Sequence, residues 1–143
     1  MRQWTIPLAV AVSLAAACSE QQEAVLDYTV NDAAPAVPIR AMQIFELDAQ
    51  DRLIGFIAFI WGGRVPMPDR GSITYLDEVP APFRVCAVAL GEEEGQWFHA
   101  LGGPVQPIAD QVVSVTLTLE AVDSGGEVPA PCGPEIAPWP EGV

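Results

Sequence analysis

The stretch Val112-Val113-Ser114-Val115-Thr116-Leu117-Thr118-Leu119-Glu120-Ala121-Val122 has the clearest periodicity in the chain. Its odd-numbered positions from 113 to 121 are apolar, whereas positions 114, 116, 118 and 120 are polar. Successive side chains of a β-strand point to opposite faces, so an alternation of two predicts a strand with one buried and one wet face. The expected fold therefore contains a sheet that covers a core on one side.

Shorter apolar segments precede this stretch, and turn-forming residues separate them. They are residues 24–30, 41–47, 52–61, 72–76, 83–90 and 96–101, of which 24–30 is expected to be an edge strand. Residues 48–51 and 91–95 are polar or charged hairpin turns, and residues 102–110 form an expected loop. Because no segment after the first 17 residues has a helical stripe, we expect an all-β fold, a β-sandwich or a small barrel.

The N-terminus resembles a bacterial lipoprotein signal. Arg2 is the only charge before Glu20, residues 6–17 are apolar, and Leu-Ala-Ala-Ala precedes Cys18 like a lipobox. The apolar run is shorter than the ~20 residues that cross a bilayer. We expect cleavage before Cys18, lipidation of its thiol and, since Ser19 follows, sorting to the outer membrane. An ordinary cleaved signal or an N-terminal anchor helix are the alternatives.

The expected organisation has four parts. Residues 1–17 are the helical signal peptide, 18–23 a polar tether, 24–122 the β-sandwich domain and 123–143 a Pro- and Gly-rich tail. The net charge is −13 and the chain has no lysine. A nucleic-acid partner is therefore not expected, because such binding needs a basic face. A cationic protein partner would suit the charge, but acidity often serves solubility alone.

Two cysteines remain once Cys18 is lipidated. Cys86 lies in the segment 83–90 and Cys132 in the tail. In an exported chain a disulfide is the expected state, and it would fold the tail back over the strand that holds Cys86. Two free buried thiols are the alternative.

Residues 52–61 are apolar on both expected faces, whereas a strand with one solvent-exposed face would be apolar on only one. One face would hold Leu53, Ile57, Phe59 and Trp61, and the other Ile54, Phe56, Ala58 and Ile60. A central strand covered on both faces would explain this pattern. A loop or the tail covering the second face is one interpretation. The other is an exposed apolar groove, with Ile54, Phe56 and Ile60 as a partner surface.

Residues typical of catalysis or metal binding are sparse. His99 is the single histidine, and no serine lies in a nucleophile motif, so we expect neither an enzyme nor a His-based metal site. Glu46, Asp48 and Asp51 do not have the spacing of a calcium loop, which favours a solvated turn. No cofactor and no small-molecule substrate are expected.

The order of features from residue 24 to 122 resembles the YbaY/YscW-like small lipoproteins of Gram-negative envelopes, a family that includes type III secretion pilotins. The resemblance lies in the lipobox, Tyr28 in a first strand, residues 41–48, the joint Gly62-Gly63-Arg64-Val65-Pro66-Met67-Pro68, residues 83–88 and the strand 113–119. It implies an outer-membrane lipoprotein with a small antiparallel β-sandwich of the transthyretin/prealbumin-like type. Only Cys18 carries over as a functional residue, and the cysteine pair and the long tail depart from the family pattern.

The expected function is therefore that of a lipid-anchored, non-enzymatic envelope protein on the periplasmic face of the outer membrane. It would bind or pilot another envelope protein. The alternatives are an acidic periplasmic inhibitor of a cationic hydrolase and a purely structural lipoprotein.

Overall fold

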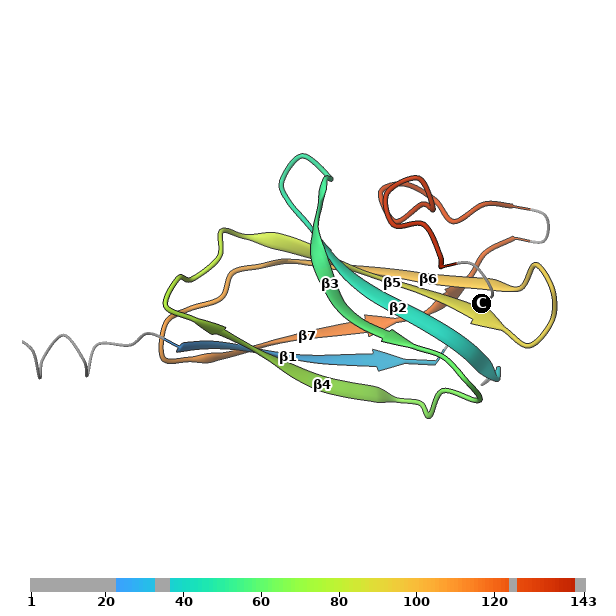
Figure 1. The fold of residues 1–143 in the computed structure, drawn as a ribbon, viewed down its shortest axis with the longest axis horizontal. Helices are drawn as coiled ribbons and strands as arrows, with labels where there is room; N and C mark the ends of the chain where they lie inside the picture. The colour runs from blue at the N-terminus through green and yellow to red at the C-terminus, as the bar shows by residue number, and fades with distance from the viewer. Residues whose placement is uncertain (1–22, 33–36, 124–125, 141–143) are drawn as a thin grey trace, which may run out of the picture.

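Two β-sheets pack face to face in the structure, a computed structural model that describes residues 23–32, 37–123 and 126–140. Figure 1 shows the strands of both sheets running along the long axis of the molecule. The strands are β1 (Glu23–Asn31), β2 (Ile39–Leu47), β3 (Leu53–Ile60), β4 (Asp69–Leu76), β5 (Phe83–Gly91), β6 (Trp97–Val105), β7 (Val112–Thr118) and β8 (Glu120–Ala121). The described residues contain no helix, which confirms the all-β sandwich.

The smaller sheet has the strand order β4-β1-β7, and the larger one has the order β3-β2-β5-β6-β8. β1 is thus a central strand, and the expectation of an edge strand is wrong. β1 pairs antiparallel with β4 but parallel with β7, so the sandwich is not purely antiparallel. The parallel pair joins strands that lie far apart in the sequence, so no local turn signal could predict it.

The main core lies between the two sheets. The smaller sheet contributes alternate residues of β1 and β7, including Leu26, Val30 and Leu117, and the larger sheet contributes the inward side of β2, β5 and β6. Tyr28 and Val65 also lie in this core, so the Gly62–Pro68 joint is fixed to the fold by its one buried valine. Burial of this apolar surface is the main driving force for folding.

The alternation that begins at Val112 continues only to Leu119. The amide of Leu119 still bonds to Asn31 of the small sheet, whereas the amide of Val122 bonds to Trp97 of the large sheet. The chain therefore changes sheets between these residues. Val115, Leu117 and Leu119 are buried as expected, but Ala121 is exposed, because the crossing ends the inward-facing series.

β6 runs through Gly102 to Val105, where the sequence had predicted a loop. A Cβ atom at Gly102 would overlap the side chain of Leu117 and lie 3.0 Å from that of Val115. The glycine thus permits a close approach of β6 to β7, and that requirement, rather than a turn, explains its presence.

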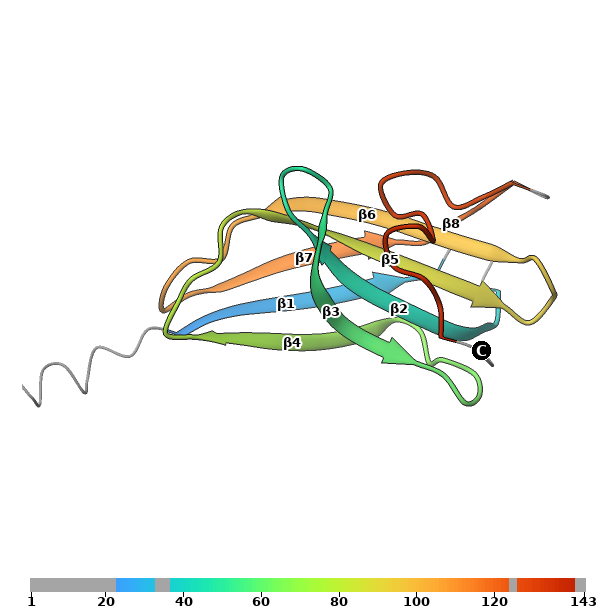
Figure 2. The same ribbon diagram turned by 45° about the horizontal axis from the view of Figure 1, so that its top comes forward.

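The tail folds back across the outer face of the larger sheet, as Figure 2 shows. The Cys86–Cys132 disulfide fixes it there, with the two Cα atoms 5.7 Å apart, which confirms the predicted pairing. A second apolar cluster forms beneath the tail from Phe45, Leu47, Cys86, Val88, Val128, Cys132 and Ala137. β2 and β5 are consequently covered on both faces, by the small sheet on one side and by the tail on the other.

Candidate functional site

The predicted partner surface lies on β3, at the edge of the larger sheet. The expectation that this doubly apolar strand is central is wrong, because β2 and β5 occupy the covered positions. β3 pairs with β2 alone within the described residues. One side of its backbone thus has no strand beside it, and those of its apolar side chains that are exposed need another explanation than burial between the sheets.

Two register shifts in the β2–β3 pair change which face of the sheet the side chains of β3 lie on. Phe56 lies opposite Phe45 on the outer face, whereas Ile60 lies opposite Met42, and its side chain packs against the core between the sheets. A bulge adds one residue to a strand and reverses the facing of every residue beyond it. The expectation that Ile54, Phe56 and Ile60 share one face is therefore wrong.

The exposed apolar residues of β3 and its end form what we call the β3 edge surface. It consists of Leu53, Ile54, Phe56 and Trp61, with exposed fractions of 37%, 54%, 55% and 63%. Phe56 also rests edge-on against the buried Phe45, with ring centroids 6.1 Å apart. This contact restricts the ring while leaving more than half of the side chain open to solvent.

The tail covers only part of the outer face of β3. Trp139 packs on Phe59 at a centroid distance of 5.4 Å, and Phe59 is half-buried. Trp61 contacts Phe59 as well, with ring centroids 4.9 Å apart, so the exposed residues of the β3 edge surface lie on both sides of Phe59 along the strand. The tail thus covers Phe59, whereas Ile54 and Phe56 stay exposed, and binding of a partner there stays a prediction.

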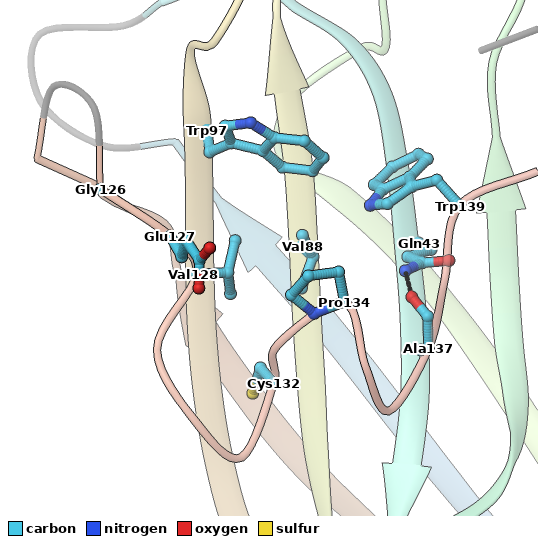
Figure 3. Close-up of a pocket in the computed structure, with 10 residues that line it drawn as sticks. All are labelled: Gln43, Val88, Trp97, Gly126, Glu127, Val128, Cys132, Pro134, Ala137 and Trp139. Carbon is cyan, nitrogen blue, oxygen red and sulfur yellow. Dashed lines mark hydrogen bonds between the residues drawn. The ribbon is translucent and has the colours of Figure 1, made fainter.

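A pocket of about 150 Å³ lies between the tail and the larger sheet. Figure 3 shows Trp97 of β6 and Trp139 of the tail next to each other at one end of it, with Pro134 below them. The two indole rings meet edge to face, with centroids 5.8 Å apart. The remaining lining residues are Gln43, Val88, Gly126, Glu127, Val128, Cys132 and Ala137.

Gln43 is the one polar residue in the buried part of β2, with an exposed fraction of 1%. Its amide Nε2 donates a hydrogen bond of 2.7 Å to the carbonyl of Ala137, marked by the dashed line in Figure 3. Its Oε1 accepts no hydrogen bond from the described residues. Turning the amide over would bring Oε1 against the Ala137 carbonyl, so the donor contact fixes which atom is left free.

Sequence reasoning missed this pocket. A signal was present in Gln43 itself, because a long polar side chain interrupts an otherwise apolar strand and buried polar groups require partners. Trp139 gave a weaker signal, as a large aromatic residue in a Pro-rich tail. Nothing in the sequence indicated that the two would lie together, because that depends on the path of the tail.

Glu46 is separate from the turn in which the sequence placed it. Its carboxylate accepts a hydrogen bond of 2.5 Å from the hydroxyl of Tyr75, which links the two sheets. Burial raises the pKa of Glu46, and the bond from Tyr75 lowers that pKa by less. Burial and the contact with Glu46 both raise the pKa of the Tyr75 hydroxyl. This pair is a structural link between layers.

Asp48 organises the turn between β2 and β3. Its Oδ1 accepts hydrogen bonds from the backbone amides of Gln50 and Arg52, and its Oδ2 contacts Arg52 Nε at 3.0 Å. The hydrogen bond from the Arg52 amide is the main reason that the pKa of Asp48 is lowered. The carboxylate serves the turn, in agreement with the predicted solvated turn.

The other candidate residues do not converge. His99 lies half-buried on β6, opposite Val88 of β5 and Glu120 of β8. Across the described ranges, no three histidine, cysteine, aspartate or glutamate side chains gather as a metal site. Nor does this part of the chain contain a helix long and apolar enough to cross a membrane. Cys18, the predicted lipidation site, lies outside the described residues.

No family model, no curated protein and no solved structure matches this chain.

Proposed function

We propose that this protein is a lipid-anchored, non-enzymatic envelope protein that binds an extended segment of another envelope protein along β3. The observation that carries the proposal is the β3 edge surface: a strand with one unpaired side that also exposes Leu53, Ile54 and Phe56. A monomeric protein usually protects such an edge with charges, prolines or a covering segment. β3 has no charge and no proline within its eight positions, Leu-Ile-Gly-Phe-Ile-Ala-Phe-Ile, and its register shifts and the contact of Trp139 with Phe59 leave Leu53, Ile54 and Phe56 exposed.

An extended peptide fits this edge better than a helix or a small molecule. The free N–H and C=O groups of an edge strand can extend the sheet by one strand of a partner. The exposed side chains beside it would then contact alternate residues of the added strand. Main-chain hydrogen bonds would supply affinity, and Phe56 and Ile54 would favour apolar residues in the partner.

The lipid anchor supports a partner at the membrane. Residues 18–23 span at most about 20 Å when extended, because each residue adds about 3.5 Å. β1 begins at Glu23, so an anchor on Cys18 would hold the sandwich close to the bilayer. An envelope protein that has not yet assembled exposes unpaired strands in that region, and it is the client that we propose. Piloting of such a client, as the resemblance to pilotins implies, is the same proposal in its narrowest form.

Photo-crosslinking in living cells tests the proposal. A benzophenone side chain replaces Ile54 in the full-length protein, and a control variant carries it at Leu76 of β4, which is equally exposed. We expect a crosslinked envelope protein from position 54 and none from position 76. Mass spectrometry should map the crosslink to an extended, alternately apolar segment of the partner.

Three outcomes would overturn the proposal. Equal crosslinking from both positions would mean that the β3 edge surface is not selective. Crosslinks only between copies of this chain would replace the client with self-association. Loss of the complex at high salt would favour the acidic-inhibitor alternative, because added ions screen charge attraction but leave apolar contacts intact.

A further inference from the structure

The outer face of the smaller sheet is polar along most of its length and apolar at one end. On each of its two edge strands, three of the four exposed positions are polar or charged: Arg70, Ser72 and Thr74 on β4, and Ser114, Thr116 and Thr118 on β7. The fourth exposed position is Leu76 at the end of β4 and Val112 at the start of β7. Because β4 runs antiparallel and β7 parallel to β1, both apolar residues lie at the end of the sheet where β1 begins.

The loops at this end add a third apolar side chain. The loop 77–82 follows β4 and the loop 106–111 precedes β7, and Gln106 Nε2 donates a hydrogen bond of 3.3 Å to the carbonyl of Pro80. The exposed fractions are 61% for Leu76, 60% for Val112 and 42% for Ile108 in the second loop. We call these three residues the tether-end surface. The other large apolar residues that are exposed in the described chain belong to the β3 edge surface or, for Leu101, to β6.

The tether-end surface lies at the end of the sandwich nearest the proposed anchor. Figure 1 shows β1 beginning at the left end of the molecule, where β4 ends and β7 begins. Cys18 lies five residues before Glu23. The chain between them spans at most about 20 Å, so a lipid on Cys18 would bring this end of the sandwich to the bilayer.

The charges at this end select the kind of lipid. Glu23, Asp77, Glu78 and Asp110 lie in or beside the two loops, and the segments 23–25, 76–82 and 106–112 contain neither lysine nor arginine. An anionic bilayer carries a negative surface potential and would repel these carboxylates. The ammonium groups of phosphatidylethanolamine would attract them, while the apolar side chains enter the interface. A zwitterionic lipid surface therefore fits both the charges and the apolar residues.

We propose that the tether-end surface rests on a zwitterionic bilayer, as a second membrane contact beside the lipid on Cys18. The inference rests on the proposed lipid anchor, because three apolar side chains bury too little surface to bind alone and the anchor supplies a high effective concentration. The β3 edge surface is not part of this contact. Loss of Leu76 alone leaves Ile108, Val112 and the anchor in place, so it is not expected to affect binding along β3.

Photo-crosslinking to lipid tests the inference on the full-length, lipidated protein in vesicles of phosphatidylethanolamine and phosphatidylcholine. A benzophenone side chain replaces Leu76, and in the control it replaces Thr118, which is exposed on the same face at the far end of β7. Mass spectrometry should find phospholipid joined to position 76 and none joined to position 118. Equal crosslinking from both positions would overturn the inference, as would no crosslink from position 76 in protein that floats with the vesicles. Protein that does not float would refute the proposed anchor itself, and the inference with it.

Substitutions test whether the apolar side chains hold this contact. Ile108→Ser combined with Val112→Ser should reduce the crosslink from position 76 about tenfold, because two apolar side chains no longer stabilise it. Leu101→Ser is the matched control, since Leu101 is an exposed apolar residue outside the surface, and it should leave the crosslink unchanged. An equal reduction in both variants would overturn the inference. Unchanged far-UV circular dichroism and an unchanged urea midpoint establish that each variant is folded.

A change of lipid tests the role of charge. Vesicles in which phosphatidylglycerol replaces half of the lipid should give a several-fold weaker crosslink from position 76. Asp77→Asn combined with Asp110→Asn should restore most of it. Asparagine readily adopts the left-handed backbone of these two aspartates, with φ of 69° and 60°, so the loops should keep their conformation. An equally strong crosslink on the anionic vesicles would overturn the zwitterionic contact that we propose.

Discussion

Removal of the Cys86–Cys132 disulfide should destabilise the whole sandwich and release its tail first. The bond closes a loop with a sequence separation of 46 that contains β6, β7 and β8. In the chain-entropy model, closing such a loop restricts the unfolded state by about 4 kcal/mol at 25 °C. The variant Cys86→Ala/Cys132→Ala should lose about this free energy of unfolding.

The local effect concerns the cluster beneath the tail. Val128, Cys132 and Ala137 are buried against the outer face of the larger sheet. Few other contacts hold residues 126–140 to the sheet, apart from the Gln43–Ala137 hydrogen bond and the contacts of Trp139. Without the disulfide, the tail should therefore open at a lower free energy than the sheets, which share the main core.

Urea unfolding followed by two probes measures both effects. Far-UV circular dichroism follows the sheets, and tryptophan fluorescence follows Trp97 and Trp139, together with the mostly exposed Trp61. A loss of about 4 kcal/mol lowers the midpoint by about 2 M if the dependence on urea is about 2 kcal/mol/M. In the variant, the fluorescence transition should precede the circular dichroism transition, while they coincide in the oxidised protein.

Reduced wild-type protein is the control, because it loses the bond but keeps both side chains. The reasoning is refuted if the free energies of unfolding of the variant and of the reduced protein lie less than about 1 kcal/mol below that of the oxidised wild type. It is also refuted if both thiols react with an alkylating agent before any reductant is added.

Three other substitutions test separate parts of the account. Cys18→Ser should move the mature protein from the membrane fraction to the soluble fraction, and a variant that still fractionates with the outer membrane would exclude the lipidation. Gly102→Ala should lower the free energy of unfolding by about 1–3 kcal/mol, since the added methyl group overlaps Leu117; an unchanged urea midpoint would contradict this close approach. Glu46→Gln should remove one source of the pH dependence of the free energy of unfolding. Burial raises the pKa of Glu46 above 4.5, so the folded state binds this proton more tightly than the unfolded state does. The stability that this group contributes is therefore present at low pH and is lost as the pH rises through the folded pKa. The free energy of unfolding of the wild type relative to Glu46→Gln should thus fall as the pH rises above 4.5, and a constant difference would show that Glu46 is not buried as described.

The two-residue alternation predicted the strands well because it depends on local burial. The expected strands 41–47, 52–61 and 83–90 lie within two residues of the observed bounds, whereas the expected strand 112–122 ends at Thr118. The pairing of the strands was beyond such reasoning, since it depends on contacts between distant segments. The parallel β1–β7 pair and the transfer of the chain to the other sheet after Leu119 both belong to this class.

β3 shows the same limit at the candidate site. Its sequence indicated an unusual strand, because both of its expected faces are apolar. Whether the strand is central or at an edge depends on which strands pair with it, and these lie elsewhere in the sequence. The register shifts near Phe45 and Leu47 then decide that Phe56 is exposed while Ile60 packs inward. The disulfide was predictable from two cysteines in a chain that we expect to be exported, whereas the pocket was not, because it forms only where the tail crosses Gln43 and Trp97.

Phe56→Asp tests the central claim most directly, measured as the yield of the crosslinked complex from position 54. Its control is Leu76→Asp, which places the same charge at an equally exposed apolar position of the other sheet. The account predicts that Phe56→Asp abolishes the complex and that Leu76→Asp preserves it. The free energies of unfolding of the two variants should differ by less than about 1 kcal/mol, because surface substitutions usually have small effects on stability. A folded Phe56→Asp protein that still forms the complex would contradict the account, and one that unfolds would show that Phe56 belongs to the core.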